Sequence, residues 1–138
     1  MDAKSYLQQV EMLDEIIKNK LIEREQWKEI ALGITASMGG EKVQSSGNNQ
    51  KMAVAIEKCV DMEAEIDKLI DKFVDTKKKV IETIEKLYSP TEYKILHMRY
   101  IQHISLTDIA EKLNKEYSWV TTTHGRALKN VQRMLDWK

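Results

Sequence analysis

A run of hydroxyl, glycine and basic side chains near the C-terminus is the part of this sequence best suited to binding chemistry. It reads SWVTTTHGRALK, residues 118–129, and it places threonines and a glycine, which are poor helix formers, in a segment with helical apolar spacing. Threonine offers a hydroxyl for hydrogen bonds to base edges and a methyl for contact with thymine. Arginine and lysine one turn later suit phosphate oxygens, and glycine permits close approach of the backbone. The candidate DNA contacts are therefore Ser118, Trp119, Thr121, Thr122, Gly125, Arg126 and Lys129.

Each of these residues also has an interpretation without DNA. The threonines fit a plain helix surface, and Thr123 is expected to face the core in part. Trp119 suits a contact with a partner protein, since aromatic side chains are enriched at protein interfaces. Arg126 and Lys129 fit a solvated helix face. The pattern alone therefore leaves DNA binding and other binding roles open.

Three short helices must position this run of residues. Apolar spacing predicts them over about 91–102, 105–113 and 118–136. Ser105 and Ser118 suit N-caps, and Asn114 suits the left-handed end of the middle helix. The break at 115–118 is typical of a helix-turn-helix, whose second helix presents its N-terminal residues to base edges in the major groove. The expected core positions are Leu106, Ile109, Ala110, Leu113, Val120, Ala127, Val131 and Met134.

The segment Ser89-Pro90-Thr91-Glu92 predicts a sharp helix start. Serine suits the cap, proline suits the first helical position, and a glutamate three residues after the serine is typical of a capping box. We place the domain border here. Residues 1–89 are expected to form an N-terminal helical hairpin for oligomerisation or partner binding, and residues 90–138 a helix-turn-helix domain.

Two long helices are expected before that border, over about 3–36 and 52–88. The loop between them, 37–51, contains three glycines with serines and asparagines, and Val43 and Gln44 are candidates to tuck against the hairpin. One loop between two long helices predicts an antiparallel, coiled-coil-like hairpin. Such a hairpin buries one narrow seam, so the leftover apolar surface predicts a homodimer. The expected seam residues are Leu7, Val10, Leu13, Ile17, Leu21, Trp27, Ala31 and Ile34, with Ile56, Cys59, Ile66, Leu69, Ile70, Phe73, Val80, Ile84 and Leu87.

The composition indicates an all-α, cytoplasmic protein without an enzymatic site. Residues 1–89 carry a net charge of −3 and residues 90–138 a net charge of +3, the direction expected for nucleic-acid binding at the C-terminal end. The sequence has no run of 18 apolar residues, so we expect no membrane span. One cysteine and three histidines at unsuitable spacing give no metal site, and no phosphate-binding loop or catalytic group is present, so we expect no cofactor.

The C-terminal residues resemble region four of bacterial sigma factors, which reads the upstream element of promoters. The matching motifs are Ile95-Leu96, Met98-Arg99-Tyr100, Ile104-Ser105, Asp108-Ile109-Ala110 and Arg126-Ala127-Leu128. The resemblance implies a trihelical domain on double-stranded promoter DNA, with an ion pair between Arg99 and Asp108. Two departures are that His103 and Asn114 stand where sigma factors usually have glycine. The segment before Arg126 also lacks the basic residues that sigma factors often present there.

The whole chain is also similar to a family of small regulators encoded by phages and prophages of Gram-positive bacteria. That resemblance implies transcription control of late genes in the bacterial host cell, with host RNA polymerase as a further partner. Two alternatives stay open. One is a small-terminase-like DNA-packaging protein, and the other is an RNA-polymerase-binding module without DNA readout.

Overall fold

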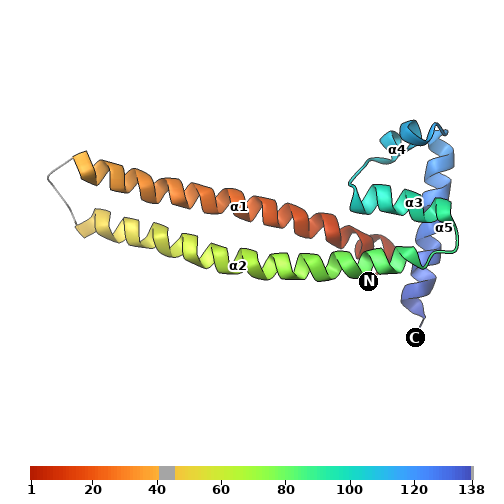
Figure 1. Ribbon diagram of the computed structural model, residues 1–138, viewed down its shortest axis with the longest axis horizontal. Helices are drawn as coiled ribbons and strands as arrows, with labels where there is room; N and C mark the ends of the chain where they lie inside the picture. Colours follow the sequence, from red (N-terminus) through yellow and green to blue (C-terminus); the bar gives the residue numbers. More distant parts are fainter. Residues whose placement is uncertain (41–45, 138) are drawn as a thin grey trace. The chain divides into compact units, whose positions relative to one another are not determined.

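The protein is all-α, as the sequence predicts. The computed structural model describes the backbone of residues 1–40 and 46–137, and the side chains of residues 1–33 and 49–137. Two long helices, α1 (Ala3–Gly40) and α2 (Ser46–Glu85), form an antiparallel hairpin (Figure 1). Three packed helices follow: α3 (Pro90–Leu96), α4 (Leu106–Leu113) and α5 (Tyr117–Asp136). None of the described helices is long and apolar enough to cross a membrane.

The connection between the long helices is shorter than the loop expected at 37–51. Helix α1 runs to Gly40 and α2 begins at Ser46, so ten of those positions are helical. Glycine lowers helix propensity by only about 1 kcal/mol per residue, and such local preferences are routinely overridden. The expectation that Val43 and Gln44 tuck against the hairpin lies outside the described residues. At its other end α2 stops at Glu85, three residues before the predicted end.

Packing contacts divide the chain into two compact units, and the division runs through the hairpin. One unit joins residues 1–14 to residues 73–138, and the other consists of residues 15–72. The domain border predicted from the sequence is at Ser89-Pro90, where α3 begins, and it stays a prediction. The base of the hairpin therefore packs with the three C-terminal helices.

The larger core of the first unit is built from helices far apart in the sequence. Leu7 and Val10 of α1 are fully buried, as are Val80 and Ile84 of α2. They belong to one apolar cluster with Val131 of α5. Its remaining buried members are Ala3, Leu87, Leu96, Tyr100 and Ala127. The main-chain N–H of Ala3 also donates to Oε1 of Gln132 over 2.7 Å.

In the second unit the seam between α1 and α2 follows a seven-residue repeat. Ala55, Met62 and Ile66 are buried, and the half-buried Cys59 and Leu69 complete the 3–4 alternation of a coiled coil. The prediction was wrong for three residues of this unit: Ile56 and Ile70 lie one position outside this repeat and are exposed, and Leu21 of α1 is exposed as well. The predicted side chain of Ile34 lies outside the described residues. A period of 3.5 residues, in place of 3.6, decides which of two neighbouring apolar residues faces the partner helix.

Local capping signals place most ends of the short helices. The Ser89 hydroxyl accepts from the main-chain N–H of Glu92, and the Ser105 hydroxyl accepts from that of Asp108. Asn114 ends α4 in the left-handed conformation, with φ of 54°. These three predictions are confirmed. Ser118 as a cap is wrong: the cap of α5 is Glu116, so Ser118 already lies in the first helical turn.

The helix expected over 91–102 is α3 followed by a π-helical turn, η1 (His97–Ile101). The wider turn buries Met98 and Tyr100 and ends before His103, whose φ is 61°. It leaves Arg99 partly exposed, with its Nη1 3.6 Å from Oε2 of Glu11 on α1. The predicted pair with Asp108 is therefore wrong. Asp108 is exposed in the first turn of α4, while the ion-pair partner of Arg99 comes from the N-terminal helix.

Candidate nucleic-acid interface

Helices α4 and α5 form a helix-turn-helix that is held by a small apolar core. Ile109 and Ala110 of α4 are buried in one cluster with Val120 of α5 and with Ile95 and Met98. The small Ala110 side chain permits a close crossing of two helices. The turn is tight because Asn114 is left-handed and the N–H of Lys115 donates to the carbonyl of Ala110 over 2.9 Å. The start of α5 is thereby fixed relative to α4 (Figure 1).

The face of α5 opposite this core carries most of the predicted DNA contacts. We call it the recognition face and define it as Ser118, Thr122, Gly125, Arg126 and Lys129. Four of these side chains are exposed and Gly125 is half-buried. The spacing of Ser118, Thr122, Gly125 and Lys129 is four, three and four, which aligns them along one side of the helix. The structure therefore places these residues together on one exposed side of α5.

The three threonines differ in what their hydroxyls can offer. Thr121 donates to the carbonyl of Ser118 over 3.0 Å, and the buried Thr123 donates to the carbonyl of Trp119 over 2.8 Å. Both hydroxyl protons are therefore used within the helix. The hydroxyl of the exposed Thr122 has no such bond to another described residue. Thr122 is thus the threonine best placed for a hydrogen bond to a base edge, and Thr121 lies half-buried beside the recognition face.

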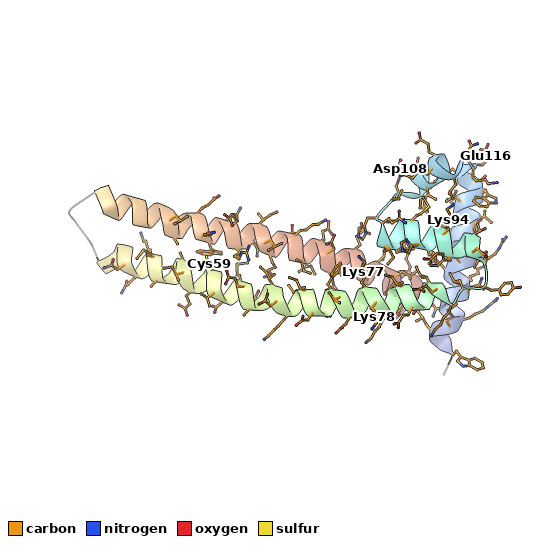
Figure 2. All side chains as sticks on the ribbon, viewed as in Figure 1. Cys59, Lys77, Lys78, Lys94, Asp108 and Glu116 are labelled. Carbon is orange, nitrogen blue, oxygen red and sulfur yellow. The ribbon has the colours of Figure 1, made fainter. Side chains whose placement is uncertain are left out.

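Trp119 lies beside two lysines that sequence reasoning missed as site residues. It is 36% exposed, and Nζ of Lys115 lies 5.2 Å from the centre of its ring. Lys94 of α3, labelled in Figure 2, lines the same depression of about 290 Å³. We call Lys94, Lys115 and Trp119 the lysine–tryptophan cluster. Spacing gave no signal for it, because Lys94 and Trp119 lie on different helices and meet only through the fold.

Gly125 has no structural need to be glycine. A Cβ atom built on it meets no atom within 4 Å, and its φ lies in the helical region. Gly125→Ala is expected to stabilise the protein by about 1 kcal/mol, because alanine is the better helix former. The same methyl group is expected to weaken DNA binding if the recognition face lies against DNA. Thermal unfolding and duplex binding of one purified variant measure both effects.

A matched control exists in Gly33→Ala. Gly33 lies in helix α1 and its Cβ also meets nothing within 4 Å. The Gly33→Ala variant is expected to gain stability in the same way, with unchanged DNA affinity. Unchanged affinity in Gly125→Ala as well would contradict a close approach of DNA to this face.

His124 joins α5 to the π-helical turn. Its Nε2 lies 2.8 Å from Oη of Tyr100, in a hydrogen bond, and the two rings stack with centres 5.7 Å apart. Burial lowers the pKa of His124, and the positive charges of Arg99 and Lys4 lower it further. Burial likewise raises the pKa of the Tyr100 hydroxyl. Both side chains are therefore held in their neutral forms at the rear of the recognition helix.

This lowered pKa predicts acid sensitivity. Above the ordinary histidine pKa of 6.5, the folded and unfolded chains both hold His124 neutral. As pH falls below that value, the unfolded chain takes up a proton while the folded chain resists it, so the free energy of unfolding decreases. His124→Gln is expected to flatten this decrease in denaturant titrations between about pH 6.5 and 5. The exposed His103→Gln controls for the loss of a histidine. An equally steep decrease in His124→Gln would contradict the prediction.

The described residues hold no cluster of three or more histidine, cysteine, aspartate or glutamate side chains that could bind a metal ion. What the site offers is a hydroxyl-bearing, partly basic helix face. No protein-family model, no curated protein and no solved structure matches this chain.

Proposed function

We propose that the recognition face of α5 binds double-stranded DNA in the major groove, and that the protein is a sigma-like transcriptional regulator of phage origin. The observation that carries the proposal is the exposed row from Ser118 to Lys129 on the second helix of a packed helix-turn-helix. That helix is the one that presents base-reading side chains in DNA-binding proteins of this kind. The row combines a free hydroxyl, a glycine and two cations.

Two backbone positions support the likeness to sigma region four. Among the described residues, positive φ angles at non-glycine residues occur at His103 and Asn114, with values of 61° and 54°. These are the two positions where the sigma pattern usually has glycine, the residue that adopts positive φ without strain. The turns on either side of α4 thus have the backbone that the sigma pattern calls for, although the side chains differ.

Each part of the site has a role in this proposal. Thr122 contacts a base edge, and Gly125 lets the helix approach the groove floor. Arg126 and Lys129 bind phosphate oxygens, and the lysine–tryptophan cluster extends the cationic surface beside the first turn of α5. The resemblance supplies the context of late phage promoters and host RNA polymerase. A homodimer would present two recognition helices to two half-sites.

The test is DNA binding at several salt concentrations. Arg126→Ala combined with Lys129→Ala is expected to reduce the slope of log affinity against log salt by about 2, since each lost phosphate contact removes about 0.9. Lys68→Ala combined with Lys72→Ala removes the same charge from exposed positions of α2 and is the matched control. Thr122→Ala is expected to alter sequence preference more than the salt slope, because it removes a base contact.

The outcomes separate the proposal from its alternatives. Selection of bound duplexes from a random library should yield one preferred sequence with native protein. Equal salt slopes for the two double variants would overturn the assignment of α5. A folded protein that binds RNA polymerase and no DNA at low salt would favour the interaction module, and a ring of many subunits would favour the packaging protein.

A further inference from the structure

One side of the hairpin in the second unit exposes a row of large apolar side chains beside its buried seam. Leu32 of α1 is 60% exposed, and Ile56 and Val60 of α2 are 49% and 59% exposed. They line one groove of about 420 Å³, next to the half-buried Cys59 that is labelled in Figure 2. A contiguous exposed apolar patch of this kind is typical of an interaction surface. The face is helical on both sides of the groove, so another pair of helices fits it.

The charges that border this groove are divided between the two helices. Arg24 and Lys28 lie on the α1 side, and Glu63 lies on the α2 side. All three line the same groove as Ile56 and Val60, so they border one stretch of the hairpin. Along this stretch the face therefore has a positive edge on α1 and a negative edge on α2, with apolar residues between them. We call this surface the hairpin face.

We propose that the hairpin face is the contact between two copies of this chain, which pack as a four-helix bundle about a two-fold axis parallel to the hairpin. Such an axis keeps each residue at its level and exchanges the two sides, so α1 of one copy lies over α2 of the other. The basic edge of each copy, Arg24 and Lys28, then lies over the acidic edge of the other, at Glu63, and the apolar rows meet between them. The surface is complementary to itself under this one operation.

The other face-to-face two-fold axis, perpendicular to the hairpin, lacks this complementarity. It lays α1 over α1 and α2 over α2, which brings the basic edges together and the acidic edges together. Like charges placed opposite one another oppose association, whereas the parallel axis gives opposite charges. The charge pattern thus favours a second copy of this chain as the partner of the hairpin face, and it favours the parallel two-fold axis over the perpendicular one. This inference concerns residues 15–72 and stands independently of DNA binding by α5.

The test is a charge exchange divided between two chains. Glu63→Lys alone, and Arg24→Glu with Lys28→Glu alone, are each expected to weaken self-association roughly tenfold or more, because each puts like charges across the interface. An equimolar mixture of the two variants is expected to form heterodimers close to native affinity. In the mixture every cross-interface pair is again opposite in sign, while the pairs within each chain remain alike. Sedimentation equilibrium measures all three samples, and circular dichroism checks that each variant is folded.

Two readouts make the outcome decisive. Cys59 is the single thiol of the chain and borders the groove, so its alkylation rate is expected to fall as native protein concentration rises. Val60→Lys, in the middle of the apolar row, is expected to abolish that protection. A native protein that stays monomeric and shows constant alkylation would overturn the proposal. So would a mixture that associates no better than its separate variants.

Discussion

Leu7→Ala is expected to destabilise the C-terminal helices by about 2–5 kcal/mol, although Leu7 lies in the first turns of the chain. The side chain is fully buried in the cluster that contains Val131 of α5 and Val80 of α2. Its removal leaves a cavity where helices from both ends of the sequence meet. The cost is large because the three helical segments around it cannot all collapse into the space.

Amide hydrogen exchange around Val131 measures this effect at the distant helix. In Leu7→Ala those amides are expected to exchange faster. The increase in exchange rate should match the decrease in the free energy of unfolding that urea titration measures. Met12→Ala is the matched control, since Met12 lies on the same helix, is 61% exposed and is not part of the hairpin face. It is expected to change stability by no more than about 0.5 kcal/mol. Unchanged exchange at α5 in Leu7→Ala would show that residues 1–14 are not part of this core.

Ile109→Ala is expected to lower the free energy of unfolding by a similar amount, about 2–5 kcal/mol, and to remove the proposed DNA binding as well. Ile109 is fully buried between Ile95 of α3 and Val120 of α5, in the smaller of the two cores. That core sets the angle at which α5 leaves the turn. A cavity there loosens α4 and α5 together, so the recognition face loses its fixed orientation at temperatures where the hairpin is still helical.

Two measurements separate local loosening from global unfolding. Circular dichroism at 222 nm, the standard helix signal, reports mostly on the long helices, whereas duplex binding reports on the recognition face. Affinity in Ile109→Ala is expected to fall at temperatures below the helical melting transition. Ile22→Ala, at a residue 57% exposed on α1, is the control and is expected to keep both properties. A stability loss under about 1 kcal/mol in Ile109→Ala would contradict the packing described for this core.

Local signals in the sequence predicted the short helices well because their physical causes are local. A serine caps a helix by accepting from the main-chain N–H three residues later, and an asparagine ends a helix by adopting the left-handed conformation. Both effects act within one turn of the chain. Ser89, Ser105 and Asn114 therefore have the expected roles. Ser118 failed because a cap requires extended backbone, and Glu116, two residues earlier, has it.

The remaining features depend on contacts between distant residues, and periodicity does not encode them. Helical spacing placed Leu7 on an apolar face without revealing that α5 is among its neighbours. The partner of Arg99 was sought in α4, yet it is Glu11 of α1. Within the candidate site, the recognition face of α5 was predictable, because all of its residues lie on one helix and helical spacing aligns them. The lysine–tryptophan cluster was not, since it needs α3 and the turn before α5 to meet.

The bond between Ala3 and Gln132 joins positions 129 apart in the sequence, and this has a consequence for how the chain folds during synthesis. A ribosome releases residues 1–14 long before Val131, so the apolar side chains of Ala3, Leu7 and Val10 emerge without the helices that cover them. The residues that pack together in the hairpin of residues 15–72 are all synthesised before α5, so this unit can form first. Completion of the other core must then await the synthesis of α5, and such non-local closure is slow. In the newly made chain the start of α1 is therefore open to chaperones and to aggregation until α5 is made.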